Sequence, residues 1–441
     1  MNAIIELFEA IKNNNIDKVK LLLNQSNLVN ERYADNWTPL MLAAQNGHPE
    51  TVSLLLEMGA DIHAVDKYGD TALMVAIKKG HTDTVSLLLE WGTDFNAKDI
   101  DGITDFMLSA QSGHNKTVSI LLDRGADIHA KKKDGWNAFM SAAGKGHTET
   151  VSILLDRGAD IHAKRNDVRT ALMFAASNGQ TETVALLLDQ GDDIHAKDID
   201  GLTALMIAAA NGHTETVTLL LEWGADINAR SNNSFTALIF ASEIGHTETV
   251  TLLLDRGANI PENKNALIRT LEKASWWTPM HTAIINNELD LIQRYEYIES
   301  DITPLDLAIM IGNLDAVKHI TERASISTSS HTLFSSTHGI KFDFNDCLNK
   351  AIKAKRNNIA MFFLENGADP RFKNQLGQNS FHIACTYGNK NIIKPLLERI
   401  HAVHSAISIQ RWFRSYLFEN NKANCPKEYT ATTCLETPTQ K

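Results

Sequence analysis

A repeat of 33 residues governs most of this chain. A frame of the form Thr-x-Leu-x-x-Ala recurs every 33 residues, and one period before its first full copy Leu7 and Ala10 fit it as well. Its first residue falls at Thr38, Thr71, Thr104, Asn137, Thr170, Thr203 and Thr236, and then, less regularly, at Thr278, Thr303, Asp346 and Asn379. A fixed period of this length predicts about twelve stacked units rather than a few globular domains.

The signals within one unit, residues 132–164, predict two short helices. "KKDGWN" is a turn, "AFMSAAGK" a helix ended by Gly146, and "TETVSILLDR" a second helix ended by Gly158. Thr38 followed by Pro39 is typical of the start of the first helix, and Thr148 is expected to cap the second, with Glu149 in its first turn. Helices this short are marginal alone, so we expect them to persist by stacking.

The period, with "TPL", "GH", "LLL" and "GADI" in register, closely resembles the ankyrin repeat over residues 1 to about 400. The resemblance implies an all-α solenoid of helix-turn-helix units with short β-hairpin fingers. We expect regular repeats over 1–262 and diverged repeats over 263–400. Where the family usually has a histidine with structural hydrogen bonds, this chain has methionines, which predict a more apolar seam: Met41, Met74, Met107, Met140, Met173 and Met206.

The motif "GHTET" at Gly146 and its relatives raise the question of whether the recurrent histidines bind metal, act as bases or are structural. Equivalent residues of stacked units lie about 8–10 Å apart, too far to share one zinc ion. An active site is normally built once, and Gln180 replaces the histidine in one copy. We therefore expect the histidine to bridge the turn between the helices by hydrogen bonds, with no metal site.

Positions that differ between copies are the candidates for partner binding. The residue before the frame Thr, which the resemblance places on the partner-facing concave side, is Trp37, Asp70, Ile103, Trp136, Arg169, Leu202 and Phe235. The alternative is that Trp136 and Phe235 pack on neighbouring fingers. Basic residues gather nearby, chiefly Lys131, Lys132 and Lys133, and predict either attraction of an acidic partner or a solvated rim. The net charge of −11 argues against general nucleic-acid binding.

Two segments depart from the repeat. Residues 324–345 form a Ser/Thr-rich insertion, interpreted as a flexible loop, with phosphorylation as the alternative. Residues 401–422 predict a helix that either caps the array or binds an EF-hand protein such as calmodulin, since Ile409, Gln410, Trp412, Phe413 and Arg414 resemble part of an IQ motif. The polar tail, 423–441, resembles the translocation signals of ankyrin effectors that intracellular bacteria inject into host cells.

No catalytic constellation or cofactor motif is found. The pair His382 and Cys385 occupies packing positions of a repeat, and no P-loop, GxSxG, HExxH or dinucleotide fingerprint occurs. The competing class is an enzyme whose catalytic element lies in residues 320–345 or 401–441. With no membrane-length apolar run, no export signal and four cysteines without a CxxC pair, we expect a cytoplasmic protein, or one in the host cytoplasm if it is a secreted effector. The sequence therefore predicts a non-enzymatic protein-binding scaffold.

Overall fold

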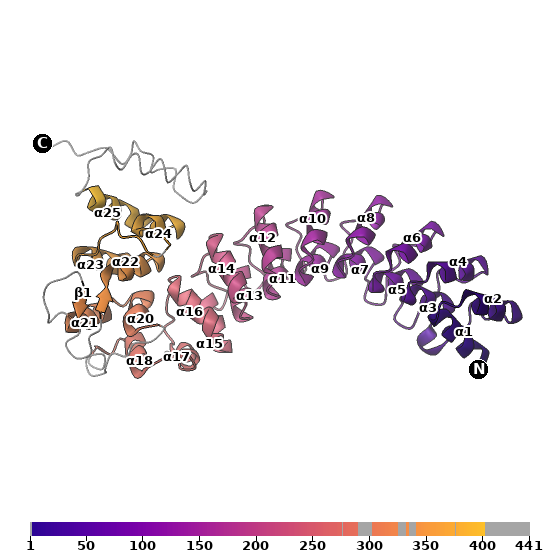
Figure 1. Cartoon of the computed structure of the whole chain (residues 1–441), viewed down its shortest axis with the longest axis horizontal. Coiled ribbons are helices and arrows are strands. Elements are labelled where there is room, and N and C mark those ends of the chain that lie inside the picture. Colours follow the sequence, from indigo (N-terminus) through magenta and orange to yellow (C-terminus); the bar gives the residue numbers. More distant parts are fainter. Residues whose placement is uncertain are drawn as a thin grey trace. The chain divides into compact units, whose positions relative to one another are not determined.

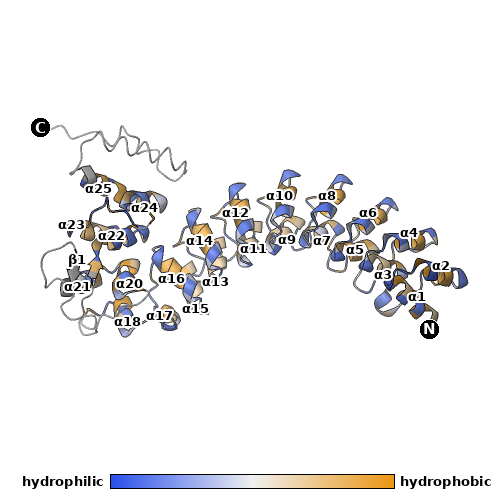
Figure 2. Cartoon of the chain, viewed as in Figure 1, coloured by the Kyte–Doolittle hydropathy of each residue, from blue (hydrophilic) through white to orange (hydrophobic). Residues whose placement is uncertain are grey.

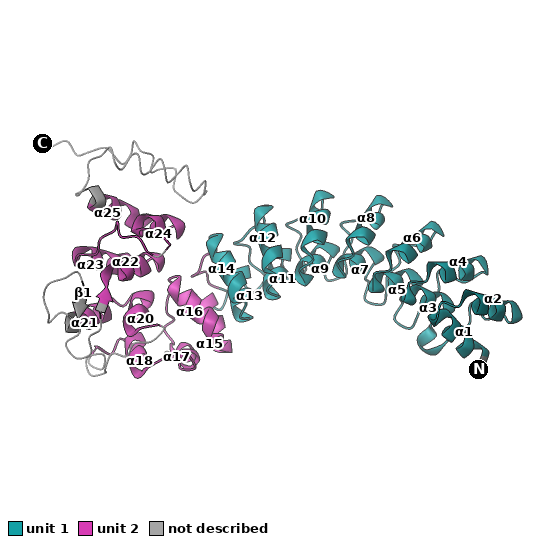
Figure 3. Ribbon diagram, viewed as in Figure 1, with its two compact units in different colours: residues 1–225, 231–233 teal, residues 226–230, 234–441 magenta. Residues whose placement is uncertain are grey.

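The computed structural model describes residues 2–275, 277–289, 302–324, 332–334, 341–374 and 376–401. They divide into two compact units (Figure 3). Unit 1 contains residues 1–225 and 231–233, and unit 2 contains residues 226–230 and 234–441.

Unit 1 is a stack of helix pairs in two rows (Figure 1). The inner row is α1 (Asn2–Lys12), α3 (Pro39–Asn46), α5 (Ala72–Lys79), α7 (Asp105–Gln111), α9 (Ala138–Lys145), α11 (Ala171–Ser177) and α13 (Ala204–Ala210). The outer row is α2 (Ile16–Gln25), α4 (Pro49–Glu57), α6 (Thr82–Glu90), α8 (Asn115–Asp123), α10 (Thr148–Asp156), α12 (Thr181–Asp189) and α14 (Thr214–Glu222). Each helix contacts its partner and the same helix of the next unit, as expected for a solenoid.

The inner helices begin where the sequence predicts. The hydroxyl of Thr38 accepts a hydrogen bond from the backbone N of Met41 at 3.2 Å, and Asn137 caps α9 through Met140 at 2.8 Å. These side chains satisfy backbone donors that a helix start leaves unpaired. At the other end of α9, Gly146 has φ 76°, the left-handed conformation that ends a helix.

The predicted cap of the outer helices is wrong. Residue His147, and not Thr148, is the N-cap of α10, and its side chain does not cap the helix. Thr148 is the first helical residue, so its hydroxyl instead shares a 2.9 Å hydrogen bond with the hydroxyl of Thr183 in α12. Glu149 lies in the first turn as predicted. The threonines of this motif therefore link neighbouring outer helices.

The core runs along the stack between the two rows. The six methionines of the inner helices are at most 2% exposed, which confirms the apolar seam. Alanines of the inner row and Val and Leu of the outer row are buried beside them, for example Ala142 with Val151 and Leu154. In Figure 2 the helices carry both hydrophobic and hydrophilic colours, as expected for helices that bury only one face. Stability therefore comes from contacts between neighbouring repeats.

Unit 2 continues the helical pattern less regularly. Its helices are α15 (Ala237–Ile244), α16 (Thr247–Asp255), α17 (Asn265–Leu271), α18 (Pro279–Asn286), α20 (Pro304–Ile311), α21 (Leu314–Ala324), α22 (Phe344–Lys353), α23 (Asn357–Glu365), α24 (Ser380–Thr386) and α25 (Lys390–His401). Helix α17 occupies the long interval between the frames at Thr236 and Thr278 and packs on α15 and α16. In α17, the Thr270 hydroxyl donates to the carbonyl of Ser242 at 2.7 Å. The irregular spacing is therefore filled by an additional helix.

Arginine 356 ties distant parts of unit 2 together. Its Nε donates to the carbonyl of Met310 at 2.9 Å and its Nη2 donates to the carbonyl of Ala258 at 2.8 Å. Gly257 lies so close to the backbone of Ala354 that a side chain at that glycine has no room. The turn after α16 therefore packs on the loop between α22 and α23.

The predicted insertion, 324–345, contains a short hairpin. Strand β1 (Thr332–Phe334) pairs antiparallel with β2 (Lys341–Asp343), with Leu333 opposite Phe342. Helix α21 extends to Ala324 and helix α22 begins at Phe344, so the first residue and the last two residues of the predicted insertion are helical. Residues 325–331 and 335–340, as well as residues 402–441, lie outside the described residues.

Candidate functional site

The fingers that join successive repeats of unit 1 are tight hairpin turns. In six of them a backbone N donates to the carbonyl four residues later, at 2.8–3.1 Å; the donors are Tyr33, Asp66, Asp99, Lys132, Arg165 and Asp198. Isolated antiparallel bridges join Lys98 to Thr104 and Lys131 to Asn137. The short β-hairpin fingers expected from the family resemblance are therefore present.

Aspartates stabilise two fingers near the N-terminal end of the array. Oδ1 of Asp66 accepts hydrogen bonds from the backbone N of Tyr68 and of Asp70, at 2.8 and 2.9 Å. Oδ1 of Asp99 accepts equivalent bonds from Asp101 and Ile103, at 2.9 and 2.8 Å. An aspartate that bonds to the backbone two residues on is a common turn device, so the fingertips are held in one conformation.

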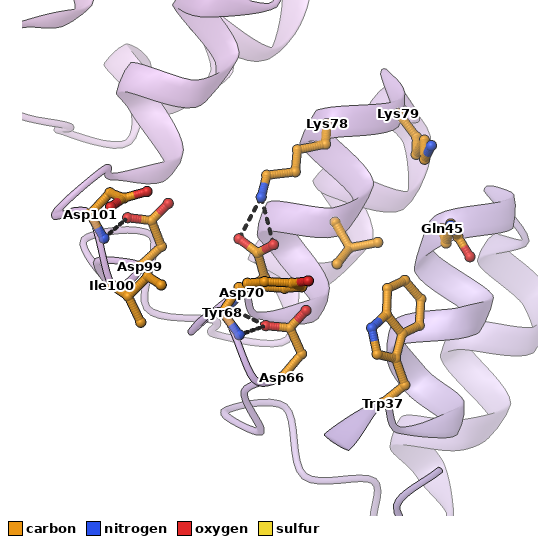
Figure 4. A pocket seen from close by; sticks show the side chains of 11 residues that line it. Trp37, Gln45, Asp66, Tyr68, Asp70, Lys78, Lys79, Asp99, Ile100 and Asp101 are labelled. Atoms are coloured by element: carbon orange, nitrogen blue, oxygen red, sulfur yellow. Dashed lines mark hydrogen bonds and ion pairs between the residues drawn. The ribbon is translucent and has the colours of Figure 1, made fainter. Parts of the chain in front are cut away.

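A cavity of about 420 Å³ opens between these fingers and the inner helices α3 and α5 (Figure 4). Its lining includes the side chains of Trp37, Gln45, Asp66, Tyr68, Asp70, Val75, Lys78, Lys79, Asp99, Ile100 and Asp101. Two of the predicted partner-binding residues, Trp37 and Asp70, are thus brought together. The Asp70 carboxylate is buried and accepts two hydrogen bonds from Lys78 Nζ, at 2.7 and 2.5 Å.

Trp136 packs on the following repeat. Its indole N–H donates to Ser141 Oγ at 2.5 Å, and its ring meets Phe174 of the next repeat edge-on, with centroids 4.4 Å apart. The guanidinium of Arg165 lies over both rings, 5.8 and 5.7 Å from their centroids. The indole is half-buried, so it joins two repeats and still presents part of its surface.

The basic residues fall into two groups. Arg169 is held by the scaffold, because its Nε donates to Asp198 Oδ2 of the next finger at 3.1 Å. Lys131 and Lys133 are exposed and Lys132 is partly exposed, on the finger that contains Trp136. Lys131 and Lys132 contribute backbone atoms to the hairpin of this finger, and the carbonyl of Lys133 accepts a hydrogen bond from the Asn166 amide at 3.1 Å.

The remaining predicted positions are spread along the chain. Ile103 and Leu202 are half-buried in the fingers of unit 1. Phe235 belongs to unit 2, is 40% exposed and meets Phe240 edge-on at 5.5 Å. The residues of the IQ-like segment, Ile409, Gln410, Trp412, Phe413 and Arg414, lie outside the described residues.

The recurrent histidines bond to the preceding repeat. Nε2 of His81, His147 and His213 donates to the carbonyl of Gln45, Gln111 and Ser177, respectively, at 2.9–3.0 Å. Each ring lies over the mid-repeat glycine of that preceding repeat, and a Cβ on Gly113 would come within 2.5 Å of His147 Nδ1. The histidines are structural, as predicted, but their side chains bond to the preceding repeat rather than across the turn of their own repeat.

Burial and the neighbouring rings of His147 and His81 lower the pKa of His114. Within the part of the chain that the structure describes, no group of His, Cys, Asp or Glu is placed to hold a metal ion. Cys385 is buried and His382 bonds to the capping residue Asn379, as expected for packing positions. The helices described also include none long and apolar enough to span a bilayer.

A match to a protein-family model identifies the family of this chain. The model described as ankyrin repeats (3 copies) matches residues 7–99, 106–198 and 172–264, which together make up more than half of the chain. The chain belongs to the ankyrin-repeat family. Arrays of this family are generally protein–protein interaction modules and typically lack catalysis. No curated protein sequence matches the chain.

Three large apolar side chains at the fingertips of the ankyrin array were not among the predicted site residues. Tyr68, Ile100 and Ile199 are 51%, 70% and 62% exposed, although large apolar side chains are usually covered. The sequence "DIDG" around Ile100 and Ile199 indicates this exposure, because it places an isoleucine in the middle of a polar turn.

Proposed function

We propose that this ankyrin array is a protein-binding scaffold whose contact surface is the row of fingers and the inner helices beside them. One observation carries the proposal: a scaffold of nearly identical repeats holds hydrogen-bonded fingers, and the residue before the frame Thr differs between most of them. Exposed aromatic and aliphatic side chains next to charges are what protein interfaces use as anchors. The partner-binding residues proposed are the seven positions before the frame Thr, together with Lys131, Lys132 and Lys133.

The lysines of the finger 131–133 support an acidic partner region at that point. Opposite charge speeds association and orients the partner, and its effect falls as salt rises. Affinity capture from a eukaryotic cell lysate with the full-length chain, beside a triple Lys→Glu variant of residues 131–133, tests this function. Lys116→Glu on the outer helix α8 is the control for a charge reversal away from the fingers, since Lys116 is exposed on another face. Equal capture by all three proteins contradicts the assignment of the contact surface to the fingers.

A second candidate concerns residues 401–422, and only sequence supports it. The IQ-like residues Ile409, Gln410 and Arg414 favour binding of an EF-hand protein, and the competing role is a cap on the last repeat. A peptide of residues 401–422 is mixed with calmodulin, with and without calcium. Binding in neither condition contradicts this role.

Delivery into a host cell is a separate proposal that the tail 423–441 supports by its resemblance to effector signals. A reporter fused to the full chain is expected to enter host cells, and deletion of the tail is expected to prevent entry. Turnover of any substrate by the purified chain in a broad activity screen would instead favour the competing enzyme class.

A further inference from the structure

Two fingers of identical sequence stand in different surroundings. Residues 97–102 and 196–201 both read "AKDIDG", and both aspartates at the turn, Asp99 and Asp198, bond to the backbone in the same way. The first finger lines the cavity, whereas Asp198 of the second is paired with Arg169 at 3.1 Å. Any difference in what the two fingers bind therefore comes from their neighbours.

The cavity beside the first finger has an apolar part. Trp37 and Tyr68 lie on either side of the hollow in Figure 4, and Ile100 lies at the fingertip. Val75 of helix α5 also lines the cavity. Tyr68 and Ile100 are more than half exposed. An apolar side chain that entered the cavity would bury these surfaces, which favours binding.

The charge of the cavity is negative. Asp70 and Lys78 pair with each other, so the remaining charged lining is three carboxylates, Asp66, Asp99 and Asp101, against the ammonium group of Lys79, a net charge of −2. The backbone bonds to Asp66 and Asp99 are all accepted by Oδ1, and a carboxylate can accept about four hydrogen bonds in all. The carboxylates therefore retain capacity for a cationic donor.

Aromatic rings in the cavity add to this preference. Lys67 Nζ, which pairs with Asp35 at 2.6 Å, lies 4.8 Å from the centroid of the Tyr68 ring, so one face of this ring already carries a cation. Tryptophan, here Trp37, is the aromatic side chain that attracts cations most strongly, and a guanidinium stacks on such rings better than an ammonium does.

We propose that this cavity binds a segment of a partner protein in which an arginine or lysine stands next to an apolar residue. The inference rests on the proposed scaffold function and names the chemistry of one part of its partner. The finger of Lys131–Lys133 follows one repeat later, so a long basic stretch would be repelled there. The cationic part of the segment is therefore short, and the segment becomes neutral or acidic toward the next finger.

Peptide selection tests the proposal. A random peptide library is selected on the immobilised full-length chain, and the affinity of the enriched peptides is measured for variants of the two identical fingers. Asp101→Lys is matched by Asp200→Lys, since both residues are exposed and donate to the aspartate two residues before. Ile100→Ala is matched by Ile199→Ala at the neighbouring position.

The enriched peptides are expected to carry Arg or Lys beside a large apolar residue. Their affinity is expected to fall about tenfold in Asp101→Lys at low salt, and to stay within about twofold in Asp200→Lys. Ile100→Ala is expected to weaken binding more than Ile199→Ala does. Circular dichroism of each variant checks that the fold is retained.

The proposal is overturned if the selection enriches acidic or uncharged peptides, if it enriches none, or if the two lysine variants weaken binding equally. Enrichment of acidic peptides would indicate that the cavity binds anionic side chains through Lys79 instead. The triple Lys→Glu variant of residues 131–133 separates the two proposals. If it still loses its captured proteins while the cavity shows no preference for cationic peptides, the scaffold function stands and the proposed occupant of the cavity does not. If the chain binds neither peptides nor proteins, both fail.

Discussion

Replacing Asp105 by alanine is expected to stabilise unit 1. Asp105 is the first residue of α7 and 0% exposed, and neither of its carboxyl oxygens has a hydrogen-bond partner. The equivalent residues of the other regular repeats are apolar: Pro39, Ala72, Ala138, Ala171, Ala204 and Ala237. A buried polar group without a partner costs about 1–3 kcal/mol. Alanine removes that cost and fits the same site, so we expect Asp105→Ala to gain about 1–3 kcal/mol.

The gain depends on pH in a defined direction. Burial, reinforced by the negative charges of Asp94 and Asp70, raises the pKa of Asp105 well above its ordinary value. Above about pH 4 the unfolded chain releases this proton while the folded chain keeps it, so the wild-type protein loses stability as pH rises. The advantage of Asp105→Ala should therefore grow as pH rises from about 4 to 7.

Urea unfolding followed by circular dichroism measures this advantage, with midpoints compared at several pH values. Asp105→Asn keeps a buried polar group but cannot ionise, so the difference between the Asn and Ala variants is expected to be independent of pH. Ala138→Asp, one repeat later, is expected to reproduce the loss. A neutral or destabilising effect of Asp105→Ala at pH 7 would refute the reasoning.

Three further outcomes follow from backbone, histidine and arginine geometry. Val168 has φ 67°, a left-handed conformation that most fingers give to a glycine. Val168→Gly should therefore raise the free energy of unfolding by about 1–2 kcal/mol, and Gly102→Val should lower it, as measured by urea midpoints. The pKa of His114 is lowered in the folded state, so the stability of the protein should fall as pH drops below about 6.5. His114→Gln, which places at this position the residue found at Gln180, should weaken this pH dependence in thermal melts. Arg356→Ala should cost about 3 kcal/mol in unit 2, because two carbonyls lose a charged donor, and Arg356→Lys should recover only part of it; an unchanged melting curve contradicts this role.

Most of the fold was predictable because it is periodic. The capping roles of Thr38 and Asn137, the ends of the helices and the buried methionines all follow from residue type at a fixed position. The cap at Thr148 was predicted wrongly, because one residue of helix phase decides whether a hydroxyl faces its own helix or the next one. Helix α17 was not foreseen either, since its seven residues carry no copy of the frame.

The candidate site was only partly predictable. Position within the repeat identified Trp37 and Asp70, but the cavity also needs Tyr68 and Ile100 from successive fingers, and their distances depend on how the repeats stack. The same limit explains Trp136, whose packing partner, Phe174, is 38 residues away in sequence. Contacts between repeats that differ from copy to copy cannot be derived from the period alone.

Hydrogen–deuterium exchange of the full chain, with and without a captured partner, tests most directly whether the fingers are the binding surface. The account predicts slower exchange of the amides in residues 98–103 and 131–136 on binding, and little change in the outer helices α6 and α8. Protection confined to the outer helices, or to unit 2, would contradict it.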